Sequence, residues 1–331
     1  MQTPFRTIVK IPEADFRIDY SDELITLGSC FSEHIGQKFA DNKFKIVINP
    51  FGQLYNPASI CNAIHRLITS RAYTESDLVY YNEQYHSFDH HSSFSGNTVE
   101  ETLNSINEAL AFASLQIRTA KVLFLTPGTS HAFRLKESGR IVSNCHKFPG
   151  SHFQTTLLKG DVILNQFKSA IEALWRINPT IKIAFSVSPV RYFAFGYQEN
   201  TLSKSHLFTS IHALREMYPG IYYFPAYEMV IDDLRDYRFY KEDMLHPNDT
   251  AIAYVWQGIK KYLIEEKLWG VVDEIDRIRQ AVLHRPRNAQ SEAHSKFVHA
   301  TLNQIEKLEL TYKLDFAAEK KLLLKSIWEG L

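Results

Sequence analysis

The chain has 331 residues, of which 45% are hydrophobic and 22% are charged. This composition is typical of a globular protein with a full core and excludes an intrinsically disordered chain. The 37 Lys and Arg residues balance 37 Asp and Glu residues, so the net charge gives no reason to expect nucleic acid or an acidic membrane as a partner.

The N-terminal segment and the cysteines predict in which cellular compartment the protein is located. Residues 1–20 contain no continuous apolar region of the kind that a signal peptide needs, and no apolar run approaches the roughly 18–20 residues of a membrane span. Cys30, Cys61 and Cys145 cannot all pair, and their spacing fits no zinc site. We therefore expect a cytoplasmic protein with free thiols, no metal and no cofactor.

Short apolar runs alternate with amphipathic segments along the first 265 residues. The runs predict β-strands at 24–27, 46–48, 122–126, 181–187 and 221–224. Helical spacing predicts helices at about 31–40, at 60–68, after a capping box at Thr98, over 163–174, and after a cap at Ser203. This order predicts an α/β fold, a three-layer α/β/α sandwich around a mostly parallel five-stranded sheet.

Two segments depart from this plan. Residues 73–97, rich in Tyr, His and Ser, are too long for a simple connection, and both a binding loop and an excursion with one small hairpin fit them. After residue 267 the strand signals stop and helical patterns continue to the end. We expect a main domain over 1–267 and a helical extension over 268–331, which packs on that domain or on a second copy in a homo-oligomer.

The first predicted strand ends at Gly28-Ser29-Cys30, immediately before a helix. Free N–H groups and the helix dipole at this position favour a thiolate and can lower a cysteine pKa below its usual value. Cys30 is therefore a candidate nucleophile, and Ser29 is the neighbouring alternative. An isolated cysteine is also often only a small buried apolar residue.

Asp243-Met-Leu-His246 places a carboxylate three residues before an imidazole, just ahead of a predicted helix start at Pro247-Asn-Asp. In a hydrolase, the imidazole takes the proton of the nucleophile, and the carboxylate fixes the tautomer of the imidazole. A helix-capping turn with a surface histidine fits the same spacing.

Several blocks in a fixed order carry a family resemblance. The sequence resembles the GSCFA family, a branch of the SGNH/GDSL hydrolase superfamily, over roughly residues 20–265. This resemblance implies a three-layer α/β/α fold and ester-bond or acyl-transfer chemistry. The blocks are Gly28-Ser-Cys-Phe-Ser32, Asn144-Cys-His-Lys147, Ser186-Val-Ser-Pro-Val-Arg191, Tyr223-Phe-Pro-Ala-Tyr-Glu228 and Asp243-Met-Leu-His-Pro-Asn248.

The superfamily pattern Leu-Gly-Asp-Ser-Leu aligns without a gap on Leu27-Gly-Ser-Cys-Phe31. Cys30 then takes the position of the nucleophilic serine, and Ser29 that of the aspartate. The resemblance implies Cys30 as nucleophile, His246 as base and Asp243 as the residue that orients it.

The resemblance also implies an oxyanion hole from the nucleophile's N–H, a glycine after the second strand and an asparagine after the third. Gly52 is the candidate glycine, although a plain turn glycine fits as well. Ser130 stands where the asparagine is expected. Asn144 and His146 can replace that donor, or can be a loop-stabilising amide and a surface histidine.

His86, His90 and His91 lie close to Asp89 in the sequence. Adjacent histidines point apart on regular structure and no further ligand is specified, so we expect these residues at a pocket entrance and not around a metal.

These observations predict an ester hydrolase that acts on a small-molecule or glycan-type acyl substrate through a covalent acyl-enzyme. An O- or N-acyltransferase with the same site is the first alternative. A catalytically idle SGNH fold that binds a ligand or partner is the second.

Overall fold

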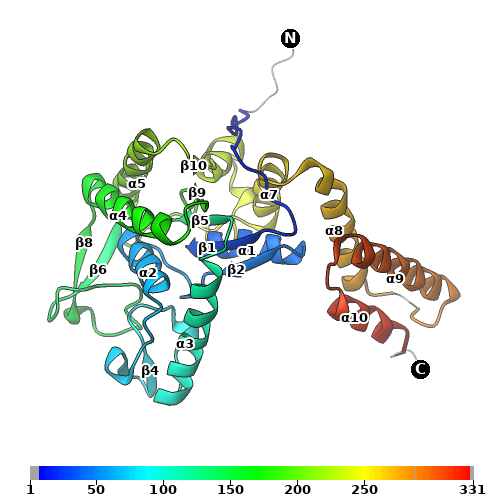
Figure 1. Ribbon diagram of the computed structural model, residues 1–331, viewed down its shortest axis with the longest axis horizontal. Coiled ribbons are helices and arrows are strands. Elements are labelled where there is room, and N and C mark those ends of the chain that lie inside the picture. The colour runs from blue at the N-terminus through cyan, green and yellow to red at the C-terminus, as the bar shows by residue number, and fades with distance from the viewer. Residues whose placement is uncertain (1–6, 287, 329–331) are drawn as a thin grey trace, which may run out of the picture.

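The computed structural model describes residues 7–286 and 288–328. Its centre is a parallel five-stranded sheet in the order β10-β9-β5-β1-β2 (Figure 1). This sheet confirms the predicted α/β fold. Its strands are β1 (Glu23–Gly28), β2 (Lys45–Ile48), β5 (Val122–Thr126), β9 (Lys182–Phe185) and β10 (Tyr222–Tyr223).

Alternating side chains divide the core between the two faces of the sheet. Val122 and Phe124 of β5 pack into one apolar cluster, and Leu123 and Leu125 into another. Buried residues of α1 (Cys30–Asp41) and α7 (Asp249–Leu263) belong to the first cluster, which continues into buried residues of the C-terminal segment 271–323. The second cluster is completed by α2 (Pro57–Thr69), α3 (Val99–Gln116), α4 (Gly160–Ile177) and α5 (Tyr197–Met217). The two helical layers enclose the sheet.

For residues 73–97, the sequence allowed either a binding loop or an excursion with one small hairpin. The structure has the hairpin, which is formed by β3 (Val79–Tyr81) and β4 (Gln84–His86). The N-cap at Thr98 is confirmed, because Thr98 Oγ1 accepts the N–H of Glu101 at 3.1 Å. The reciprocal half of the predicted capping box differs, because the Glu101 carboxylate accepts the N–H of Asn97 at 2.9 Å. A short helix, α6 (Ala226–Glu228), follows β10.

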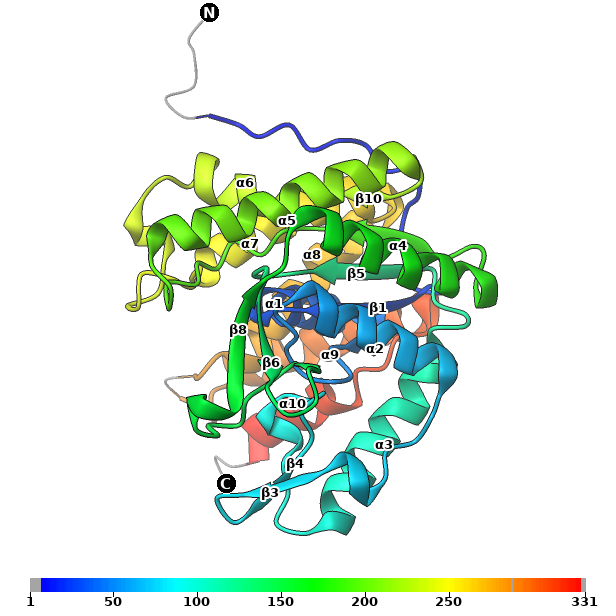
Figure 2. The same ribbon diagram turned by 90° about the vertical axis from the view of Figure 1, so that its left-hand side faces the viewer.

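A second, antiparallel sheet lies outside the main one and is absent from the sequence prediction. It has the order β7-β6-β8, with β6 (His131–Leu135), β7 (Ile141–Val142) and β8 (Phe153–Leu157) (Figure 2). The predicted cap at Ser203 is wrong, because α5 begins at Tyr197. The hydroxyl of Ser203 instead accepts the N–H of Ser130 at 2.8 Å.

The C-terminal extension forms α8 (Trp269–Leu283), α9 (Glu292–Tyr312) and α10 (Ala317–Trp328). It packs on the end of α1: Lys43 pairs with Glu319 at 2.6 Å, and Arg279 with Asp41 at 2.5 Å. A part in a homo-oligomer stays a prediction. Within 7–286 and 288–328, no helix is both long and apolar enough to cross a membrane. Residues 1–6 of the N-terminal segment and residues 287 and 329–331 of the C-terminal extension lie outside the described residues.

Candidate active site

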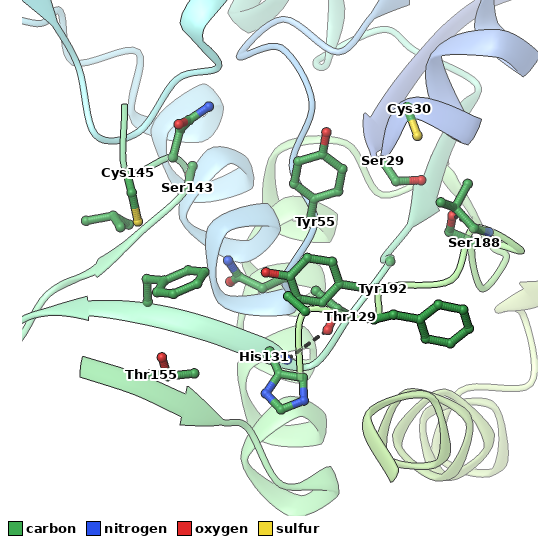
Figure 3. A pocket seen from close by; sticks show the side chains of 18 of the residues that line it. Ser29, Cys30, Tyr55, Thr129, His131, Ser143, Cys145, Thr155, Ser188 and Tyr192 are labelled. Carbon is green, nitrogen blue, oxygen red and sulfur yellow. Dashed lines mark hydrogen bonds between the residues drawn. The ribbon is translucent and has the colours of Figure 1, made fainter. Parts of the chain in front are cut away.

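A cavity of about 880 Å³ lies at the carboxyl ends of the central strands (Figure 3). Ser29 and Cys30 after β1, Gly128 after β5 and Ser188 after β9 line it. The sheet order places β1 between β2 and β5, and the next helices, α1 and α4, pack on opposite faces. Such a switch point opens a crevice, which is where open α/β sheets bind ligands.

Close packing of β1 against β5 fixes the start of α1. A Cβ on Gly28 would lie 2.5 Å from the carbonyl oxygen of Thr126, so only glycine fits at the end of β1. Cys30 follows two residues later as the first residue of α1. Its side chain is half-buried and lines the cavity.

Burial raises the pKa of the Cys30 thiol above its ordinary value, although the N–H groups of Phe31 and of Cys30 itself act to lower that pKa. Glu33 raises the pKa further, and Lys241 lowers it. The thiol is therefore protonated at neutral pH. This corrects the expectation that the helix N-terminus holds a ready thiolate: desolvation outweighs the dipole, so a base has to take the proton.

Ser29 is almost fully buried in the wall of the same cavity. Its N–H donates to Thr126 O at 3.1 Å, whereas its hydroxyl has no hydrogen-bond partner among the residues that the structure describes. The hydroxyl oxygen is itself buried, so a ligand cannot reach it without a change of side-chain position. Ser29 stays the alternative nucleophile because it lies beside Cys30 in the cavity wall.

His246 and Asp243 form a hydrogen-bonded pair. The imidazole Nδ1 lies 2.6 Å from Asp243 Oδ2, and Asp243 Oδ1 accepts the N–H groups of Leu245 and His246 at 2.8 and 3.0 Å. These backbone bonds and the imidazole lower the pKa of Asp243 to about 2. The carboxylate is therefore ionised at neutral pH and holds the proton on Nδ1, which leaves the Nε2 lone pair as an acceptor.

The turn that carries His246 is fixed at both ends. The N–H of Lys241 donates to His246 O at 2.8 Å, and Asn248 caps α7 by accepting the N–H of Ala251 at 3.1 Å. His246 lines the same cavity as Cys30. The fold thus brings together two candidate groups that are more than 200 residues apart.

Gly52, Ser130 and His146 do not line this cavity in the described part of the chain. The N–H of Gly52 donates to Asn49 O at 2.6 Å, in a left-handed turn with φ +73°. Ser130 is fully buried, and its hydroxyl donates to Ser203 O at 3.0 Å. His146 is buried with Nε2 2.8 Å from Ser87 O. The Gly52 N–H, the Ser130 hydroxyl and His146 Nε2 bond to groups outside the cavity, and none of the three residues lines it, so they do not enter the proposed site.

Asn144 does line the cavity, and its Oδ1 accepts the N–H of His146 at 2.9 Å. Asn56 and Tyr55, which the sequence analysis did not single out, line it as well. The Asn56-Pro57 pair is an ordinary helix start in the sequence, and Asn56 indeed caps α2, so nothing in the pattern marks it as a cavity residue.

Lys204 lies buried beneath the cavity wall and was also missed. Its ammonium donates to Gly128 O and to Ser188 O, both at 2.6 Å, and so ties together the loops after β5 and β9. Burial lowers the pKa of Lys204 to about 7; Arg191 lowers it as well, and Cys30 acts in the opposite direction. In the sequence, Lys204 is one of several polar residues of α5, and nothing in the pattern marks it as buried.

The histidines of the long connection have structural partners away from the cavity. His86 bonds Ser95 Oγ at 2.7 Å and Tyr81 O at 2.9 Å, and His90 stacks on Phe51. His86, His90 and His91 do not line the cavity in the described residues. Among those residues, no three His, Cys, Asp or Glu side chains are placed to hold a metal ion.

Comparison with known proteins identifies the family. Residues 23–258 match the GSCFA family, and residues 275–328 match the GSCFA domain protein, C-terminal domain. No curated protein matches the chain significantly. A solved acetyl xylan esterase (Est2A) from the rumen bacterium Butyrivibrio proteoclasticus is similar, with 13% identity, a TM-score of 0.38, and coverage of 76% of this chain and 66% of that chain. Because its family match spans most of its length, the chain belongs to the GSCFA family.

Proposed function

We propose that this protein is an SGNH-like hydrolase that cleaves ester bonds through a covalent acyl-enzyme on Cys30. One observation carries the proposal: Cys30 and His246 line the same cavity, and Asp243 holds Nδ1 of that imidazole at 2.6 Å. Nucleophile, base and orienting carboxylate have the roles of a catalytic triad.

In the acylation step, His246 Nε2 takes the thiol proton as the Cys30 sulfur attacks the ester carbonyl carbon. The tetrahedral intermediate collapses, and the alcohol leaves with the proton that His246 returns. In the second step, His246 takes a proton from water, and the hydroxide attacks the thioester carbon. The second tetrahedral intermediate then collapses with cleavage of the C–S bond, the carboxylic acid leaves, and His246 returns its proton to the Cys30 sulfur. Asp243 therefore stabilises a transient imidazolium twice in each cycle.

One group supports an oxyanion at this place. N–H groups in the first turn of a helix have no acceptor within the helix, and Cys30 supplies one of these at the start of α1. Such a donor is expected to contribute about 10²–10³-fold to the rate. Asn144 lines the cavity too, but its neighbours Ser143 and Cys145 lie across the cavity from Cys30 in Figure 3, so we assign it no part in the oxyanion hole.

The acceptor of the acyl group distinguishes hydrolysis from transfer. An acyltransferase would form the same Cys30 thioester and pass the acyl group to a hydroxyl or an amine instead of water. Product analysis with added alcohols and amines separates the two. An idle binding fold would form no thioester.

Variants at the three cavity residues test the proposal. With p-nitrophenyl esters, we expect Cys30→Ala and His246→Ala to abolish turnover, and Ser29→Ala to keep most of it. Cys145→Ala is the matched control, since Cys145 is another half-buried thiol that lines the cavity. Turnover that survives Cys30→Ala but is lost with Ser29→Ala would move the nucleophile to Ser29.

A further inference from the structure

One wall of the cavity is built by the small antiparallel sheet. Phe133 of β6, Val142 of β7 and Phe153 of β8 line it, together with Phe148 from the connection between β7 and β8. In Figure 3, Cys145 and Thr155 lie at this side of the cavity, and Ser29 and Cys30 at the other. A ligand held at Cys30 therefore faces the small sheet.

This wall is the open side of an apolar cluster. Val142 and Phe153 are buried with Phe88 in a cluster of their own, and Phe133 and Phe148 pack against it only partly buried. The Phe88 and Phe148 rings lie 5.3 Å apart, and the Phe88 and Phe153 rings 6.0 Å apart. Phe133 and Phe148 keep part of their apolar surface exposed at the cavity, so an apolar ligand group would complete the cluster.

A second cavity, of about 900 Å³, adjoins the first and shares Arg191, Phe193 and Leu245 with it. Asp243 lines this second cavity, whereas no residue of β6, β7 or β8 does in the described chain. The turn with Asp243 and His246 thus lies where the two cavities meet. The second lining is more polar and includes Arg235 and Asp236.

This arrangement orients the substrate. His246 has to protonate the leaving alcohol, so the alcohol lies on the side of the turn, where the second cavity begins. The acyl group then extends the other way, toward the small sheet. An acetyl group would leave most of the 880 Å³ cavity empty.

We infer that the substrate carries a bulky apolar acyl group, of about six to ten carbons, which packs against Phe133, Val142 and Phe153. This inference rests on the proposed acyl-enzyme at Cys30. Each methylene that leaves water is expected to raise kcat/KM about fourfold while the wall has room.

A chain-length series of p-nitrophenyl esters tests this selectivity. We expect kcat/KM for the octanoate to exceed that for the acetate by at least about tenfold. Thr155→Trp fills the cavity from β8 and should lower the octanoate-to-acetate ratio at least about tenfold. Gln154→Trp is the matched control, because Gln154 is exposed on the opposite face of β8 and should leave the ratio unchanged. A preference for acetate, or a ratio that Thr155→Trp does not move, would overturn the inference.

Binding to the Cys30→Ala protein separates this inference from the proposed function. N-ethyloctanamide should bind at least about tenfold more tightly than N-ethylacetamide in calorimetry, and Thr155→Trp should remove the difference. If no ester is turned over but this difference is found, the proposed chemistry fails and the apolar site stands. If the two amides bind equally, the apolar site is refuted whatever the turnover.

Discussion

Replacing Lys204 with methionine tests the electrostatics beneath the active site. Methionine replaces the aliphatic part of the lysine side chain but has no amine, so the carbonyl oxygens of Gly128 and Ser188 lose their 2.6 Å partner. An unsatisfied buried carbonyl costs about 1–3 kcal/mol, and two of them give about 2–6 kcal/mol. Both the ammonium and the neutral amine have enough N–H groups to serve both carbonyls, so these bonds do not decide the protonation state.

The sign of the pH dependence follows from burial. The pKa of Lys204 falls from 10.5 to about 7 in the folded protein, so between these values the unfolded chain binds more protons. The contribution of Lys204 to the free energy of unfolding therefore rises with pH across this window and is lost as pH falls through 7. Integrating the two titrations from pH 7 to pH 9 gives a rise of about 2 kcal/mol.

Urea unfolding of the wild type and of Lys204→Met at pH 7 and pH 9 measures this effect. We expect the difference in unfolding free energy between the two proteins to grow by about 2 kcal/mol at the higher pH. Lys307→Met, at an exposed position of α9, is the control and should show no such change. An equal difference at both pH values would mean that Lys204 keeps its proton, and would refute the argument from burial.

Three further predictions address the site and the sheet. Asp243→Asn should lower kcat/KM for esters by about 10²–10⁴-fold, because His246 loses the carboxylate that fixes its tautomer; an unchanged rate would count against the pair. Iodoacetamide should alkylate Cys30 at a rate that still rises above pH 9, since burial raises the pKa of its thiol; a rate that is level from pH 6 upward would contradict this. Gly28→Ala should destabilise the fold by about 1–3 kcal/mol in urea unfolding, because the new Cβ meets Thr126 O at 2.5 Å; a neutral effect would show that β1 and β5 can separate there.

The main sheet could be predicted because its central strands, β1, β5 and β9, are buried on both faces. β5 has the bounds predicted for it, and all five of its residues are buried. The run 181–187 overestimates β9, which spans Lys182–Phe185. Val187 is fully buried without belonging to the strand. An apolar run therefore indicates that a segment is buried. It predicts strand pairing only indirectly, because the paired strands of this sheet are also buried.

The small sheet could not be predicted in this way. β7 has only two residues, and β8 reads Phe-Gln-Thr-Thr-Leu, with one buried residue in five. These two segments are strands because they pair with β6, and their own sequences show no alternation of apolar and polar residues that would predict a strand. For this reason, the sequence did not predict the cavity wall of β6, β7 and β8, which we expect to select the acyl group.

The same limit applies within the site. Cys30 and His246 stand next to recognisable boundaries, a strand end and a helix start, so their positions could be predicted. Whether Gly52 has a free N–H depends on the turn around it, and Lys204 becomes notable only once α5 is packed under two loops. Hydrogen-bond partners that come from distant segments are set by tertiary structure.

Mass spectrometry of a quenched ester reaction tests the joint action of Cys30 and His246 most directly. With p-nitrophenyl octanoate and the Cys145→Ala protein, we predict one octanoyl group per chain, located on the peptide that contains Cys30. The same adduct should be absent when His246 is also replaced by alanine. An octanoyl group on any other residue, or equal acylation of Cys30 without His246, would contradict the account.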